Sequence, residues 1–113
     1  MVSIEIFKQI ALSFPEAIEL PHFERTSFRV AKKIFATLDV KEHLACIKLS
    51  EIDQNVFCSF DPSVIFPVPN KWGKQGATYI NLKKVRKDML TDALTTAYCM
   101  VAPKKLSSAI RPK

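Results

Sequence analysis

Basic side chains that can bind phosphate are concentrated in the second half of this 113-residue chain. Residues 1–61 hold seven lysines and arginines against nine acidic residues, whereas residues 62–113 hold ten against two. No acidic residue lies between Pro62 and Lys87. A basic surface attracts polyanions through long-range electrostatics, so DNA is the first partner to consider. A contribution to solubility alone is the alternative explanation of this charge.

The acid-free stretch contains a loop, residues 70–76, that holds both glycines and the only tryptophan of the chain. Lys71 and Lys74 flank Trp72 there. A lysine ammonium acts as a point charge, so these two residues suit phosphate contacts better than the reading of base edges. Trp72 can either stack on an unpaired base or pack against the sheet, and the sequence favours packing.

A second basic group surrounds the start of a predicted helix at about residues 84–101. Lys83, Lys84, Arg86 and Lys87 lie there, although the helix dipole disfavours each basic residue at a helix start by roughly 0.3–1 kcal/mol. Exposed backbone amides together with four basic side chains suit a phosphate. The pattern therefore predicts an anion-binding helix start.

Other chemistry has little support in the sequence. His22 beside Glu24 suggests an acid–base pair, but no nucleophile with an oxyanion site accompanies it, so we expect no enzyme. Cys46, Cys58 and Cys99 are widely spaced and odd in number, which is typical of small buried residues in a reducing compartment. No paired cysteine or histidine ligands occur at metal-binding spacing, so we expect neither a metal site nor a cofactor.

The helices and strands predicted to position these residues indicate an α+β fold. Its predicted form is one compact domain, residues 1–113, in which an antiparallel sheet packs against N- and C-terminal helices. Hydrophobic periodicity predicts helices at residues 4–14, 51–60 and 84–101. Alternation and turn residues predict strands at residues 26–30, 34–38, 44–49 and 78–82, with an extended segment at 64–69.

Two of these elements bear on the basic residues and on possible partners. Ala31, Lys32 and Lys33 join adjacent predicted strands, which indicates a tight hairpin with both lysines at its tip. In the helix at residues 51–60, Ile52 and Val56 share an apolar face with Phe60. No apolar run reaches the ~20 residues of a membrane span, and no leader segment precedes the first helix, so we expect a cytoplasmic protein with no membrane partner.

The order and spacing of several motifs resemble the MmcQ/YjbR family. These motifs are Pro21–Val30, Lys33–Leu38, Pro67–Gly76, Ala97–Tyr98 and Val101–Lys105. The resemblance implies a frataxin-like, or CyaY-like, fold and DNA binding through a double-wing arrangement. The matching projections here are the hairpin with Lys32 and Lys33 and the loop at residues 70–76.

We therefore expect a DNA-binding protein that contacts the phosphate backbone through a basic surface, built from residues 71–87 and the Lys32–Lys33 hairpin. The C-terminal part of the chain adds two further lysines, Lys104 and Lys105. The expected contact residues are Lys32, Lys33, Lys71, Trp72, Lys74, Lys83, Lys84, Arg86, Lys87, Lys104 and Lys105. The alternative function is a protein-interaction or regulatory module that binds no nucleic acid.

Overall fold

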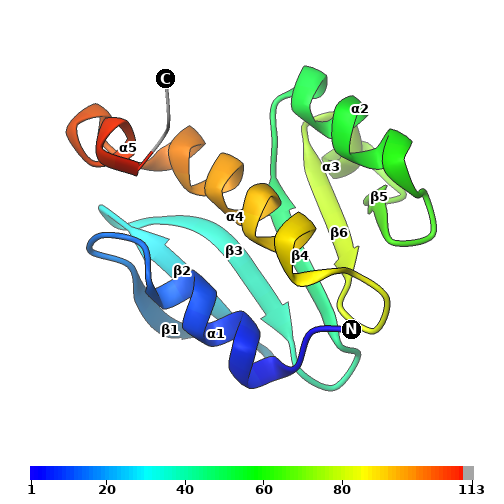
Figure 1. Cartoon of the computed structure of the whole chain (residues 1–113), viewed down its shortest axis with the longest axis horizontal. Coiled ribbons are helices and arrows are strands. Elements are labelled where there is room, and N and C mark those ends of the chain that lie inside the picture. Colours follow the sequence, from blue (N-terminus) through cyan, green and yellow to red (C-terminus); the bar gives the residue numbers. More distant parts are fainter. Residues whose placement is uncertain (111–113) are drawn as a thin grey trace.

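Helices cover one face of a six-stranded antiparallel sheet in the computed structural model, which describes residues 1–110 (Figure 1). The strands are ordered β1-β2-β3-β4-β6-β5 across the sheet. Their bounds are β1 Ile18–His22, β2 Arg25–Val30, β3 Lys33–Asp39, β4 Leu44–Lys48, β5 Ile65–Pro67 and β6 Ala77–Asn81. The helices are α1 Ile4–Leu12, α2 Glu51–Phe60, α3 Lys71–Lys74, α4 Lys87–Val101 and α5 Lys104–Ile110. This architecture confirms the predicted α+β fold and its single domain.

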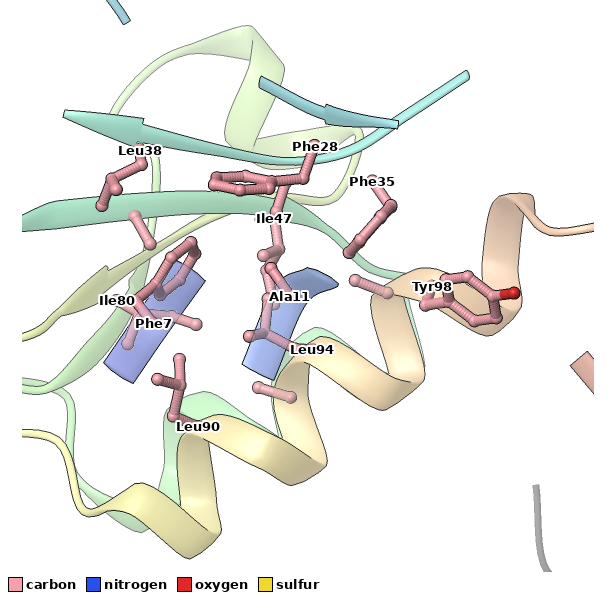
Figure 2. Packing of buried hydrophobic residues seen from close by; sticks show 14 of the residues in the cluster. Phe7, Ala11, Phe28, Phe35, Leu38, Ile47, Ile80, Leu90, Leu94 and Tyr98 are labelled. Carbon is pink, nitrogen blue, oxygen red and sulfur yellow. The ribbon is translucent and has the colours of Figure 1, made fainter. Parts of the chain in front are cut away.

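Strand alternation decides which side chains meet the helices. Successive residues of a strand point to opposite faces, and the inward set includes Phe28 of β2 and Leu38 of β3. Phe7 of α1 meets Phe28 edge to face, with the ring centroids 5.5 Å apart, and Leu94 of α4 packs in the same cluster (Figure 2). Each such side chain stabilises the fold by roughly 1.5–3 kcal/mol through its burial.

None of the helices within residues 1–110 lies over the opposite face of the sheet. The outward residues of β3, β4 and β6, such as Thr37, Cys46 and Tyr79, keep part of their surface exposed, and none belongs to the core cluster or packs against it. Figure 1 shows α1 and α4 on the same side of the strands. We call this second side the open face.

The capping residues Ser3 and Ser50 in the sequence predicted the starts of α1 and α2 correctly. Ser3 accepts a hydrogen bond from the backbone N–H of Ile6 at 3.1 Å, and Ser50 accepts one from Asp53 at 3.1 Å, so both caps satisfy amides that the helix cannot. The hairpin between β2 and β3 is also confirmed. Its turn consists of Ala31 and Lys32 alone, both with positive φ (51° and 69°).

Three elements differ from the sequence prediction. Residues 18–22 form the edge strand β1 although Pro21 lies within it, because an edge strand has a side on which a missing N–H costs no ladder hydrogen bond. Within the predicted loop, residues 71–74 form the single turn α3. After Pro103 the chain resumes a helix, α5, which packs on α4.

The apolar face of α2 is turned to solvent. Ile52, Val56 and Phe60 are 75%, 50% and 66% exposed, respectively, while the polar residue Gln54 is only 7% exposed. The sequence pattern correctly identified the three apolar residues as sharing one face of the helix, but that face is exposed. The opposite side packs inward because Gln54 there finds buried hydrogen-bond partners in Gly73 and Thr78.

Tyr98 joins the end of α4 to the end of α1. Its ring stacks on Phe14 with centroids 4.9 Å apart and meets Phe35 edge to face at 5.4 Å. From its place one position off the apolar stripe of the helix, the sequence predicts that the Tyr98 hydroxyl lies at the surface. This prediction is wrong, because the side chain is fully buried. The hydroxyl donates a 2.7 Å hydrogen bond to the carbonyl oxygen of Pro15. Burial raises the pKa of Tyr98.

We expect Tyr98→Phe to lower the free energy of unfolding by about 1–2 kcal/mol, because it removes this hydrogen bond but keeps the ring. Urea denaturation at neutral pH measures the loss. Since the pKa of Tyr98 is raised in the folded state, its contribution is fully present below the unfolded-state pKa of about 10 and falls as pH rises above that value. The difference between wild type and variant should therefore narrow above pH 10.

Tyr79→Phe on the open face is the matched control. The Tyr79 hydroxyl makes no hydrogen bond within residues 1–110, so this change should alter stability by no more than about 0.5 kcal/mol. Equal losses from both variants would contradict the role assigned to the Tyr98 hydroxyl.

Candidate nucleic-acid interface

The sequence-predicted contact residues are all exposed, but strand β6 divides those between residues 71 and 87 into two groups. Lys71 and Lys74 lie in α3, just before β6 begins, whereas Lys83, Lys84, Arg86 and Lys87 follow its end. A strand of five residues places its two ends roughly 15 Å apart. Figure 1 shows α3 and the turn from β6 to α4 at opposite ends of β6. Residues 71–87 therefore do not form one continuous surface.

The sheet register brings a different set of lysines together. Val30 pairs with Lys33 across the hairpin, and Lys48 pairs with Ala77, so the hairpin, the end of β4 and the start of β6 lie at the same end of the sheet. We call this the basic end. Its residues are Lys32, Lys33, Lys48, Lys71 and Lys74.

Lys48 was missing from the sequence-predicted set because it lies in the half of the chain with an acidic balance. A signal for it existed in the alternation of residues 44–49, which places Lys48 opposite in direction to the buried Ile47. Its position beside β6 depends on strand pairing between segments about 30 residues apart in sequence, which periodicity does not reveal.

Lys104 and Lys105 lie at the start of α5. Tyr98 packs against Phe35, two residues after the hairpin, so the end of α4 lies toward the same end of the sheet as the hairpin, and α5 continues from it (Figure 1). These two lysines are on the helix side of the sheet, and α5 packs on α4 there. They adjoin the basic end rather than form part of it.

No lysine of the basic end forms an ion pair with another residue of the described chain. The ion pairs within residues 1–110 join Lys8 to Glu19, Arg25 to Asp39 and Arg86 to Asp88. Glu51 shares an open depression of about 770 Å³ with Lys71 and Lys74 and offsets part of their charge. The remaining positive charges repel one another, so an anion bound among them would relieve that repulsion.

Trp72 is exposed, which contradicts the expected packing. Its side chain is 57% accessible, and the ammonium of Lys71 lies 5.8 Å from the centre of its ring. Asn70 accepts a 2.8 Å hydrogen bond from the Trp72 backbone N–H and so caps the single turn of α3. The turn presents Gly73 to the protein interior, and Trp72 therefore faces outward.

Both glycines of this corner are required by close backbone contacts. A Cβ on Gly73 would lie 1.9 Å from the carbonyl oxygen of Val68. One on Gly76 would lie 2.0 Å from that of Leu49, and Gly76 also has a φ of 107°, which side-chain-bearing residues rarely adopt. The Leu49 N–H donates to the Gly76 carbonyl at 2.9 Å, which ties the corner to the end of β4.

Gln54 of α2 holds the same corner from the helix side. Its side-chain amide group donates to the carbonyl oxygens of Gly73 at 2.9 Å and Ala77 at 3.2 Å, and to the hydroxyl of Thr78 at 3.1 Å. One amide group thus links α2, α3 and β6 in a region shielded from water, where an unmade hydrogen bond costs most.

A groove of about 250 Å³ runs along the open face beside Trp72. Its floor includes Thr37 of β3, Cys46 of β4 and Ala77 of β6, with Lys48 at one side. Burial raises the pKa of the Cys46 thiol, although the nearby Arg25 charge acts in the opposite direction. The thiol is therefore protonated at neutral pH and forms a neutral part of the floor, not a nucleophile.

The start of α4 differs from the predicted anion site because a carboxylate, that of Asp88, lies among the basic residues. The helix begins at Lys87, and Arg86 in the capping position makes no side-chain cap bond. Asp88 instead accepts a hydrogen bond from the Met89 N–H at 2.9 Å and pairs with Arg86 at 3.4 Å. This carboxylate offsets part of the local positive charge, and the whole group is remote from the basic end.

The described residues contain neither a group of three metal-ligating side chains nor a helix with the length and apolar character of a membrane span. The three cysteines are free thiols of intermediate burial. The expectation that they are buried therefore holds only in part.

We expect Gln54→Leu to lower the free energy of unfolding by about 0.5–1.5 kcal/mol, because the hydrogen bonds of its amide group are lost while the carbonyl oxygens of Gly73 and Ala77 keep backbone donors. Amide hydrogen exchange at residues 70–77 should accelerate more than exchange elsewhere, since the corner loses its link to α2. The exposed neighbour provides the control: Asn55→Leu should leave both measurements close to wild type. Uniform acceleration across the sheet would contradict a local role for Gln54.

Comparisons with known proteins bear on family and fold. The sequence model of the YjbR family matches residues 12–100. The crystal structure of a Deinococcus radiodurans protein, described as a DUF419 domain, is similar with a TM-score of 0.76. The alignment covers 96% of this chain and 85% of that one at 19% identity, so the likeness concerns the fold. No curated protein matches this sequence.

Proposed function

The chain belongs to the YjbR family, and from that premise we propose that it binds DNA by holding the phosphate backbone at the basic end of its sheet. The observation that carries the proposal is the convergence of Lys32, Lys33, Lys48, Lys71 and Lys74, which come from three separate elements and form no ion pair within residues 1–110. Polyanions bind such surfaces by releasing their own counterions.

The spacing between the β2–β3 hairpin and α3 supports simultaneous contact of both with one DNA molecule. The hairpin adjoins β3 and α3 adjoins β6, and these two strands are separated only by β4. Two strand spacings amount to about 10 Å, which corresponds to about three base-pair rises along the axis of a duplex. The hairpin lysines and those of α3 can therefore contact one stretch of backbone together.

The chemistry of the surface favours weak sequence preference. Lysines neutralise phosphates without reading base edges, and the basic end contains no arginine, the residue that most often recognises guanine in the major groove. The proposed role is binding without a catalytic step.

We expect the triple variant Lys48→Glu/Lys71→Glu/Lys74→Glu to lose at least tenfold more DNA affinity than Lys83→Glu/Lys84→Glu/Lys87→Glu. Both variants change the net charge equally, so a general electrostatic effect would weaken them alike. Fluorescence anisotropy with labelled DNA at ~50 mM salt measures the affinities, and salt titration gives the number of phosphates contacted. With five lysines engaged, the slope of log K against log salt should be about −4.5, falling to about −1.8 when two remain.

Two results would overturn this proposal. Wild-type protein that does not bind DNA at ~50 mM salt would exclude the function. Equal losses in the two triple variants would exclude the basic end as the site.

The exposed stripe of α2 favours protein binding as a second candidate function. Ile52, Val56 and Phe60 lie one turn apart on the side of α2 away from the core, and each is at least half exposed. Large side chains at this spacing match the way in which an amphipathic helix presents anchors to a partner groove.

We expect Ile52→Ser/Phe60→Ser to abolish any protein association that survives nuclease treatment while leaving DNA affinity within about twofold, because the stripe is not part of the basic end. Co-purification of the tagged protein before and after nuclease, together with DNA anisotropy, separates the two functions. Association that disappears with nuclease would show that DNA bridged the partners and would contradict this second function.

A further inference from the structure

The open face of the sheet carries two aromatic rings, those of Phe66 and Tyr79, that the fold buries only in part. Tyr79 lies between Cys46 and Phe66 in the strand register, so the three residues form one row across β4, β6 and β5. The rings of Phe66 and Tyr79 have centroids 5.8 Å apart and are inclined at 58°, so they are not stacked on each other. Neither residue packs against the core cluster.

Trp72 adds a third ring at the border between this face and the basic end. It borders the groove whose floor includes Thr37, Cys46 and Ala77. Since Ala77 and Tyr79 are two residues apart on β6, they point to the same face of the sheet. The tryptophan groove and the aromatic row are therefore neighbouring parts of one surface.

Charge on this face is also positive. Arg29 and Lys48 share it with Arg25, whose charge is offset by Asp39 at 3.9 Å. Asp39 is the only acidic residue among the outward-facing positions of β2, β3, β4 and β6. The face thus continues the positive potential of the basic end toward the aromatic row.

The aromatic rings and the positive charge of the open face together favour one class of ligand. Two copies of the chain placed face to face would bring these positive charges together, which opposes dimerisation through this surface. Duplex DNA keeps the faces of its bases stacked inside, whereas an unpaired strand offers them to aromatic side chains. Sheet aromatics bordered by basic residues are a general means of binding single strands, because every base has a π-face.

We propose that the open face binds single-stranded DNA, with bases stacked on Tyr79, Phe66 and Trp72 and the strand's phosphates held at the adjoining basic end. The inference rests on the proposed DNA-binding function and specifies the form of DNA that it concerns. The protonated thiol of Cys46 and the hydroxyl of Thr37 give the strand an uncharged floor between the rings and the lysines.

Binding of three labelled probes of about 12 nucleotides tests the proposal: oligothymidine, a duplex of equal length and an abasic sugar-phosphate oligomer. Oligothymidine should bind at least tenfold more tightly than the other two, because only it offers unpaired bases. It should also quench the fluorescence of Trp72, the only tryptophan. Trp72→Leu and Tyr79→Leu should each weaken oligothymidine binding by roughly 5- to 150-fold and leave abasic binding unchanged.

Phe60→Leu is the control, because it removes an exposed aromatic ring from α2, away from the open face. It should leave oligothymidine binding unchanged. Circular dichroism melts establish that the variants are folded. If Tyr79→Leu does not fold, Trp72→Leu still tests the proposal, since Trp72 is exposed.

The outcomes separate this inference from the function on which it rests. Equal affinity for oligothymidine, duplex and abasic probe would overturn the inference and leave DNA binding intact. Failure of every probe to bind would overturn both. Preference for an oligouridine RNA over oligothymidine, or concentration-dependent dimerisation that Tyr79→Leu abolishes, would overturn the inference in favour of that other occupant.

Discussion

One-sided burial of the sheet is the constraint on which the other features depend. Helices α1 and α4 supply apolar side chains to one face, and Tyr98 ties the two together through its ring contacts and its hydrogen bond to Pro15. In the part of the chain that the structure describes, no helix lies over the second face of the sheet. That face must therefore meet solvent or a partner, and the side chains on it are a mixture of aromatic, neutral polar and basic groups. Stability requires only the first face, so residues on the second can serve recognition.

A second constraint operates at the α3 corner, where recognition and stability are linked. Gly73 and Gly76 allow the backbone to approach Val68 and Leu49 more closely than any side chain would permit, and Gln54 supplies hydrogen-bond donors to this crowded region. These contacts turn a short loop into a fixed support for Trp72 and its neighbouring lysines. A positioned aromatic side chain loses less entropy when it binds than one on a mobile loop, which makes the corner effective as part of a binding surface.

The electrostatic arrangement depends on register more than on composition. The four basic residues that directly follow β6, Lys83, Lys84, Arg86 and Lys87, outnumber the two lysines of α3 just before it. They lie at the other end of the sheet, where Asp88 offsets part of their charge. Lysines from the acidic half of the chain, Lys32, Lys33 and Lys48, instead join those of α3. The chain belongs to the YjbR family, and the strand register decides how its charge is distributed over the fold.

Local sequence determined the features that depend on neighbours along the chain. Ser3 and Ser50 set the starts of α1 and α2, hydrophobic spacing identified α4, and the short link at residues 31–33 predicted the β2–β3 hairpin, because capping, periodicity and tight turns act within a few residues. Only the tertiary structure decided that Lys48 joins the basic end, that Trp72 is exposed and that the apolar stripe of α2 faces solvent. Strand pairing and burial depend on residues distant in sequence, and a buried polar group such as Gln54 can reverse the orientation that helical periodicity alone favours, once partners such as Gly73 and Thr78 satisfy it.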